Sequence, residues 1–253
     1  MNTRPAHRAP ARMPSLAGLA AAVVLAAASA LPAHAQIMNS QGCGPMYIPT
    51  HVGPFDYRNQ REMLRTVEFG HFQPNVEDLI KPMFNSFGAD IDYTLKAYPN
   101  HHRALITLNR LSLREKALKT SGSDFSVECY FFRAIRWRPD DLIVRMIYAS
   151  WLHQWDRTKD AVQQLDYVVD NAGDDPFTHY NAGMVFADLK IWDRALQQAH
   201  AAQALDFPKG DLKARLVEAG KWQEPVPGAP LPGRAAASAP ALPASAASAA
   251  ASR

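Results

Sequence analysis

The stretch Pro139–Phe207 reads PDDLIVRMIYASWLHQWDRTKDAVQQLDYVVDNAGDDPFTHYNAGMVFADLKIWDRALQQAHAAQALDF, and its pattern occurs twice. Small and apolar residues recur at a 34-residue interval, in the pairs Ala149 with Gly183, Leu152 with Phe186, Ala161 with Ala195, and Val168 with Ala202. Small residues at a helix crossing let two helices approach closely without opening voids. The stretch therefore predicts two successive pairs of packed helices.

The same interval places the helices along this stretch. Four are expected, at 142–154, 158–170, 176–188 and 191–205. Pro176 suits a first helical turn, where the missing N–H costs no hydrogen bond. One such pair cannot bury its apolar face alone, so neighbouring pairs must stack and the last must be covered. Residues 210–222 are the expected capping helix.

A further helix pair is expected before the quoted stretch, at 100–139. Counting back by the same interval from Ala161 and Val168 reaches Val127 and Ala134, although Val127 departs from the small-residue rule. A 34-residue period with small residues at the crossing is the signature of the tetratricopeptide repeat (TPR), and the chain resembles that superfamily. An ordinary helical bundle is the alternative, but it has no reason to keep this register.

The resemblance implies an all-α fold, a right-handed superhelical TPR solenoid of about three helix pairs plus a C-terminal capping helix. Its expected parts are an irregular N-terminal arm with short helices at 36–90 and a repeat domain at 91–222, with units at 100–139, 140–173 and 174–207 and the cap at 210–222. The front half also looks like uncharacterised proteobacterial envelope TPR proteins, through Gly53–Arg58, His71–Phe72, Asp92–Leu95, Pro99–Leu105 and Glu128–Phe131. This second resemblance implies a fold and an envelope location, and no function.

The first 35 residues have the pattern of a secretory signal peptide. Three arginines precede an apolar run at 16–31, and Ala35 ends a small-residue cleavage site. We therefore expect a periplasmic protein that starts at Gln36, with no membrane insertion after signal removal; a retained membrane anchor is the alternative.

The C-terminal segment 223–253 is rich in Pro, Ala and Ser. It has too few large apolar residues for their burial to offset the conformational entropy lost on ordering, which predicts a disordered tail.

Without the leader the charges balance. The full chain has 27 basic and 24 acidic side chains, and the leader contains three arginines and no acid. A basic footprint for nucleic acid is therefore absent.

Two cysteines, Cys43 and Cys129, follow the leader. In an oxidising compartment such a pair is expected to form a disulfide. The alternative is that Cys129 is a small buried apolar residue and Cys43 a free thiol.

The sequence offers no recognisable chemistry. It contains no Gly-rich phosphate loop, no G-x-S-x-G and no Cys-x-x-Cys, so we expect no enzyme activity, no catalytic residue and no cofactor. Asp140–Asp141 and Asp174–Asp175 recur at the repeat interval, which indicates turn and helix-capping residues.

Seven histidines follow the leader, without the i, i+4 spacing that favours a metal site: His51, His71, His101, His102, His153, His179 and His200. A metal- or small-ligand-binding periplasmic protein that uses the His-rich N-terminal half is the alternative function.

Binding of a protein or peptide partner is the function that the resemblance implies. In TPR proteins the first helix of each pair lines a concave groove, and the corresponding residues here are Ile143, Met146, Ser150, His153, Gln154, Phe177, Tyr180, Met184, Ala187 and Asp188. Their mixture of Met, aromatic and small polar side chains suits a peptide or helix laid in a groove. They lack the Lys and Asn arrangement that grips a C-terminal carboxylate. The alternative is that the protein's own N-terminal arm fills the groove.

Overall fold

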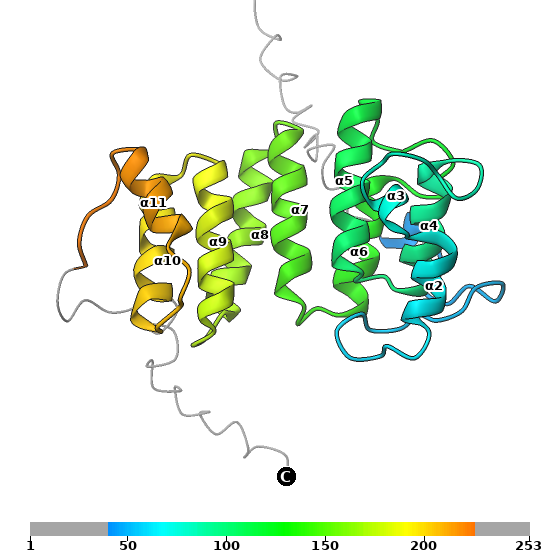
Figure 1. Ribbon diagram of the computed structural model, residues 1–253, viewed down its shortest axis with the longest axis horizontal. Coiled ribbons are helices and arrows are strands. Elements are labelled where there is room, and N and C mark those ends of the chain that lie inside the picture. The colour runs from blue at the N-terminus through cyan, green and yellow to red at the C-terminus, as the bar shows by residue number, and fades with distance from the viewer. Residues whose placement is uncertain (1–39, 226–253) are drawn as a thin grey trace, which may run out of the picture. The chain divides into compact units, whose positions relative to one another are not determined.

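The computed structural model describes residues 40–225, and this part of the chain contains helices and no strand. The elements are η1 (Ser40–Cys43), α2 (Leu64–His71), α3 (Pro74–Glu77), α4 (Phe87–Ala97), α5 (His102–Glu115), α6 (Val127–Trp137), α7 (Leu142–Gln154), α8 (Thr158–Asn171), α9 (Pro176–Asp188), α10 (Trp192–Ala204) and α11 (Asp211–Glu218). From α4 onward each helix contacts the next, and α7 lies between α5 and α9 (Figure 1). The all-α class is confirmed, whereas the expected leader and most of the expected tail lie outside residues 40–225.

The pairs α7–α8 and α9–α10 are the two hairpins that the 34-residue interval predicts, with ends within one residue of the expected positions. Their first helices end in the same way. The N–H of Arg157 donates to the Leu152 carbonyl and that of Ile191 to the Phe186 carbonyl, both at 2.9 Å. The residue before each donor has a φ of 59°, the left-handed conformation in which helices commonly end. The repeat in the sequence is thus also a repeat in backbone geometry.

The small residues predicted at helix crossings are buried. Ala149 and Ala195 have no exposed surface. A Cβ atom added to Gly183 would overlap the side chain of Leu212 on α11 and lie 3.1 Å from Cβ of Gln198 on α10. The missing side chain at Gly183 therefore lets α9 pack against both its partner helix and the helix that follows the last pair.

The helical stack begins before residue 91, the N-terminal boundary predicted for the repeat domain. Helix α4 begins at Phe87, because the hydroxyl of Ser86 accepts the N–H of Ala89 at 3.1 Å and caps the helix. Ile91 and Leu95 of this helix then belong to the same hydrophobic core as α5 to α11. The expected boundary cuts through α4, whose first turn is part of the helical stack.

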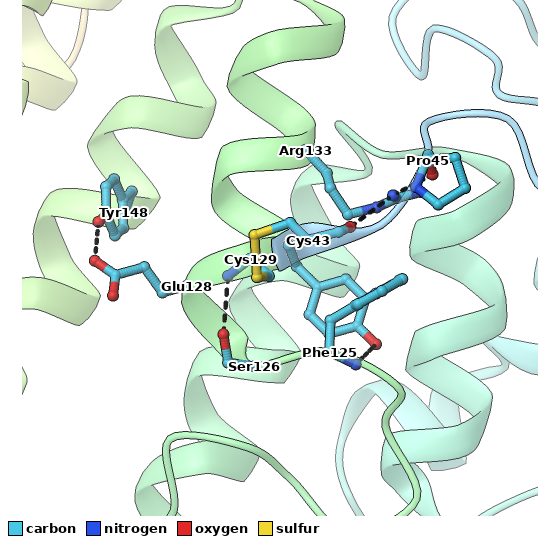
Figure 2. The surroundings of a disulfide bond; sticks show 9 residues. Cys43, Pro45, Phe125, Ser126, Glu128, Cys129, Arg133 and Tyr148 are labelled. Atoms are coloured by element: carbon cyan, nitrogen blue, oxygen red, sulfur yellow. Dashed lines mark hydrogen bonds between the residues drawn. A yellow bond between two sulfur atoms is a disulfide. The ribbon is translucent and has the colours of Figure 1, made fainter. Parts of the chain in front are cut away.

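The arm is fixed to α6 by a disulfide and by one buried arginine (Figure 2). The sulfur atoms of Cys43 and Cys129 lie 2.10 Å apart, so the two cysteines are paired as predicted. Arg133, one turn further along α6, donates hydrogen bonds to the backbone carbonyls of Cys43 at 3.1 Å and Pro45 at 2.6 Å. The described start of the arm is thus held against α6.

A second anchor lies at Asp56, whose side chain is buried where the arm meets the turns before α5 and α7. Its carboxylate accepts hydrogen bonds from Asn100 at 2.8 Å, Arg138 at 2.7 Å and Arg58 at 2.8 Å. Burial would raise the pKa of Asp56, but the hydrogen bonds from Arg58 and Asn100 outweigh it and hold the pKa well below its usual range. Beyond this point, α2 packs on α4, and α3 on α4 and α5. The arm therefore covers the N-terminal helices.

Candidate partner-binding groove

Helices α5, α7 and α9, the first helices of the three pairs, line one groove with a cavity of about 310 Å³. The lining residues are Ile106 and Asn109 of α5, Ile143, Met146, Ile147 and Ser150 of α7, and Phe177, Asn181, Met184 and Val185 of α9. Seven of these side chains are apolar, three are polar and uncharged, and none carries a charge. Such a composition is typical of a site for apolar side chains with a few orienting polar groups.

Helix α7 forms the middle of the groove, since it contacts α5 on one side and α9 on the other. It also packs on α6 and α8, so apolar residues occupy most of its circumference. Met146 and Ile147 are buried at the centre of the groove, whereas Ile106 and Phe177 each leave 45% of their surface exposed. Large side chains this exposed on both sides of α7 indicate a surface that another molecule can cover.

The three polar side chains of the groove differ in the hydrogen bonds that they make. The hydroxyl of Ser150 donates to the Met146 carbonyl at 3.2 Å, and the amide nitrogen of Asn181 donates to the Phe177 carbonyl at 2.7 Å. The Ser150 hydroxyl hydrogen and one of the two N–H groups of Asn181 therefore serve their own helix. Asn109 is 7% exposed, and its amide oxygen is buried without a hydrogen-bond partner. This oxygen has almost no accessible surface of its own, so it does not open into the groove.

Five of the ten residues predicted for the groove lie in it: Ile143, Met146, Ser150, Phe177 and Met184. The residues predicted from the last turn of each first helix do not line this cavity. His153 is 3.0 Å from the Thr158 hydroxyl in the turn to α8, and Gln154 is exposed at the helix end. Asp188 pairs with Arg215 of α11 at 2.6 Å. His153 and Asp188 thus contact the start of α8 and the capping helix α11, respectively.

Tyr180 and Ala187 are buried and do not line this cavity either. The Tyr180 hydroxyl donates to Asp211 at 2.9 Å, and its ring packs against Phe207 at 4.6 Å between centroids. Burial, supported by the carboxylate of Asp211, raises the pKa of Tyr180. The equivalent residue one unit earlier, Met146, lies in the groove; at Tyr180 the turn after α10 and the start of α11 occupy that space.

Sequence reasoning missed the other five lining residues, Ile106, Asn109, Ile147, Asn181 and Val185. Ile147 and Asn181 occupy matching positions in successive units, so the 34-residue interval itself could have identified them. Val185 follows Met184 on the same helix. Ile106 and Asn109 lie on α5, whose distance from α7 does not follow the 34-residue interval. They could not be aligned with the later units from spacing alone.

The alternative that the arm fills the groove is wrong for the part of the arm that the structure describes. None of the ten lining residues comes from residues 40–90. That segment packs instead on α4, α5 and α6.

The histidines of the front half hold the arm and the turns together. His101 is buried and caps α5 by accepting the N–H of Ala104 at 3.1 Å. Burial lowers the pKa of His101, against the hydrogen bond with Glu68. His102 lies 2.8 Å from the carboxylate of Asp141. No three or more His, Cys, Asp or Glu side chains between residues 40 and 225 are grouped to hold a metal ion.

The paired aspartates were predicted to cap helices, and only one of the two capping positions does so through its side chain. Asp175 accepts the N–H of Phe177 at 3.2 Å at the start of α9. Asp141 precedes α7 without such a bond and instead accepts hydrogen bonds from Asn100 at 2.8 Å and binds His102. Asn100, in the turn before α5, and His102, at the start of α5, thus bind the Asp141 carboxylate in place of the helix end.

Within residues 40–225 the structure contains no helix that is both long and apolar enough to cross a bilayer. No protein-family model, curated protein or solved structure matches this chain. The function is therefore inferred from the groove and its chemistry.

Proposed function

We propose that the protein is an exported TPR-type adaptor that binds a peptide or protein partner in the groove between α5, α7 and α9. The helix pairs stack as a right-handed superhelix of about three units, and the adaptor works in the periplasm of a bacterial cell envelope. One observation carries the proposal: an uncharged, mainly apolar groove of about 310 Å³, formed by the first helices of three successive pairs and left open by residues 40–225.

The chemistry of the groove favours a polypeptide partner. Exposed apolar residues that converge from several helices mark binding surfaces more often than they mark packing defects. Three first helices that line one groove with apolar and a few small polar side chains suit a segment laid across them. The export signal pattern and the Cys43–Cys129 disulfide both favour an oxidising compartment.

Site-specific crosslinking tests the groove in the cells that make the protein. Benzoylphenylalanine replaces Phe177 or Ile106 in the groove, or Val217 on α11, which is 55% exposed and outside it. We expect adducts with one protein from the two groove positions and none from Val217. That protein, once identified and purified, should bind the wild-type chain and lose affinity for Met184→Glu. Equal adducts from all three positions, or unchanged affinity of Met184→Glu, would reject the groove.

Export is tested separately by sequencing the N-terminus of the protein recovered from the periplasm. The expected first residue is Gln36. Recovery of the uncleaved chain from the membrane fraction would support the retained anchor instead.

A further inference from the structure

The loop 78–86 between α3 and α4 exposes three large apolar side chains. Ile80 leaves 75% of its surface exposed, Phe84 62% and Met83 38%. The loop lies at the end of the helical stack opposite α11 (Figure 1), and none of its residues lines the groove. Large apolar side chains that gather in one exposed segment mark a surface that another molecule covers.

Asn75 holds the first half of this loop. Its backbone carbonyl accepts the N–H of Ile80 at 2.8 Å and that of Lys81 at 3.1 Å. Its side-chain amide donates to the Lys81 carbonyl at 2.7 Å. Both N–H groups are thus paired within the protein, while the Ile80 side chain stays exposed.

Asp90 holds the second half of the loop. Its buried carboxylate accepts the N–H of Met83 at 2.7 Å and that of Phe84 at 3.3 Å. Pro82 lies between the two halves and has no N–H. Every backbone N–H from 80 to 84 therefore has an acceptor inside the protein. A loop that only meets water needs no such acceptors, because water itself accepts these hydrogens.

Cations surround the loop. Lys81 is exposed within it, and Arg110 and Arg114 of α5 are exposed beside it. The two guanidinium groups donate to the backbone carbonyls at 77 and 79, at 3.2 and 2.9 Å, rather than to carboxylates. The Glu77 carboxylate is paired with another arginine of α5, and Asp78 is the acidic residue of the loop. Three cations face one acid here, so the charge beside the apolar side chains is positive.

We propose that the loop 78–86 docks the protein on the surface of an anionic phospholipid bilayer. The three apolar side chains enter the outer part of the acyl region, and the neighbouring cations bind lipid phosphates. The paired N–H groups favour lipid over a protein partner, because a bilayer offers an unpaired backbone group no hydrogen bond. An apolar contact and basic residues together give the two signals that stable membrane binding needs. Such docking is peripheral, and it does not rest on the groove.

Vesicle binding tests the proposal. The protein is purified without the leader (36–253), because the apolar run of the leader would bind lipid by itself. Sucrose-loaded vesicles of phosphatidylcholine, either pure or mixed with an equal part of phosphatidylglycerol, are sedimented, and the bound protein is measured. We expect at least about tenfold tighter binding to the anionic vesicles, reduced by added salt because ions screen exposed charges.

Variants of the loop separate the apolar and the charged contributions. Ile80→Ser combined with Phe84→Ser should weaken binding to the anionic vesicles at least about tenfold, because the apolar contact is lost. Ile80→Ser alone is the second variant, since the Phe84 ring also stacks on that of His71. Lys81→Glu should weaken the same binding at least about fivefold.

The controls lie outside the loop. Val217→Ser on α11 replaces an exposed apolar residue, and Lys159→Glu on α8 replaces an exposed cation. Both should bind the vesicles as wild type does. Phe177→Glu, which removes the apolar character of the groove, should also bind them unchanged. A failure of the proposed groove and a failure of the docking loop are therefore distinguishable.

Three results with vesicles would overturn the inference. They are no sedimentation with anionic vesicles, equal binding to pure phosphatidylcholine vesicles, and unchanged binding of the Ile80→Ser variants. Two other results would replace lipid by a protein and overturn it as well. A dimer that Ile80→Ser dissociates would make a second copy the occupant. A protein crosslinked by benzoylphenylalanine at position 80, without vesicle binding, would make that protein the occupant.

Discussion

Ile106 of α5 and Phe177 of α9 line the same groove with α7 between them, and each leaves 45% of its surface exposed. Because both are exposed, a charge at either position should be tolerated by the fold and rejected by an apolar ligand. We expect Ile106→Glu and Phe177→Glu to weaken binding of the partner identified by crosslinking at least about tenfold, or about 1.4 kcal/mol. Their unfolding free energies should stay within about 0.5 kcal/mol of wild type.

Val217→Glu is the matched control, since Val217 is an apolar residue of α11 with a larger exposed fraction, 55%, and does not line the groove. It should bind the crosslinked partner as wild type does. Weakened binding by all three variants would mean that the effect is not local to the groove. Tyr180 is unsuitable for this test, because it is buried and bonded to Asp211, and a charge there would damage the fold.

The helices of the back half could be predicted closely because one local pattern decides them. The turn after Leu152 and the turn after Phe186 have the same hydrogen bond and the same left-handed residue. Small residues such as Gly183 then set how closely the helices pack. Each of these features lies within a single unit, so a sequence interval is enough to reveal it.

The groove could be predicted only in part, because its outline depends on neighbours that are distant in sequence. Met146 and Tyr180 occupy equivalent positions in successive units, but Tyr180 is covered by Phe207 and bonded to Asp211. The covering exists because no further pair follows α10 in the described chain. Similarly, Asn109 enters the groove through the packing of α5 on α7, which the 34-residue interval does not describe.

Gly183→Val should destabilise the protein by about 2 kcal/mol, because the new side chain would overlap Leu212 and press on Gln198. Gly70→Val is the control: Gly70 is also helical, and a Cβ there would have no atom within 4 Å. Its unfolding free energy should change by less than about 0.5 kcal/mol. Urea denaturation followed by circular dichroism measures both. Similar effects from the two variants would indicate a general helix effect instead of close packing at Gly183.

Removing the disulfide with Cys43→Ser and Cys129→Ser should lower the unfolding free energy by about 4 kcal/mol, because the bond closes a loop between residues 86 positions apart. The measurement is urea unfolding with and without a reducing agent. Reduction should destabilise the wild-type protein by the same amount and leave the double variant unchanged. An equal response of both proteins to the reducing agent would mean that this bond is not what reduction affects.

Asp56 should make the protein sensitive to acid. Its pKa is lowered in the folded protein, so it contributes stability above the unfolded value of about 4 that is lost as the pH falls through the folded pKa. Asp56→Asn removes the charge that binds Arg58 and Arg138, and we expect a loss of about 2 kcal/mol at pH 7. Urea denaturation at pH 7, 5, 4 and 3 should show the difference between the two proteins shrinking below about pH 4.

Asp166→Asn provides the comparison for this pH series, because Asp166 pairs with Arg194 at 2.7 Å but is 45% exposed. Water screens an exposed pair, so its removal should cost less than about 1 kcal/mol at every pH. The lowered pKa values of Glu68, Glu77, Asp124 and Asp140 remain in both variants and account for the acid sensitivity that Asp56→Asn retains. A difference between wild type and Asp56→Asn that stays constant from pH 7 to pH 3 would show that the Asp56 carboxylate is not what holds the arm to the helices.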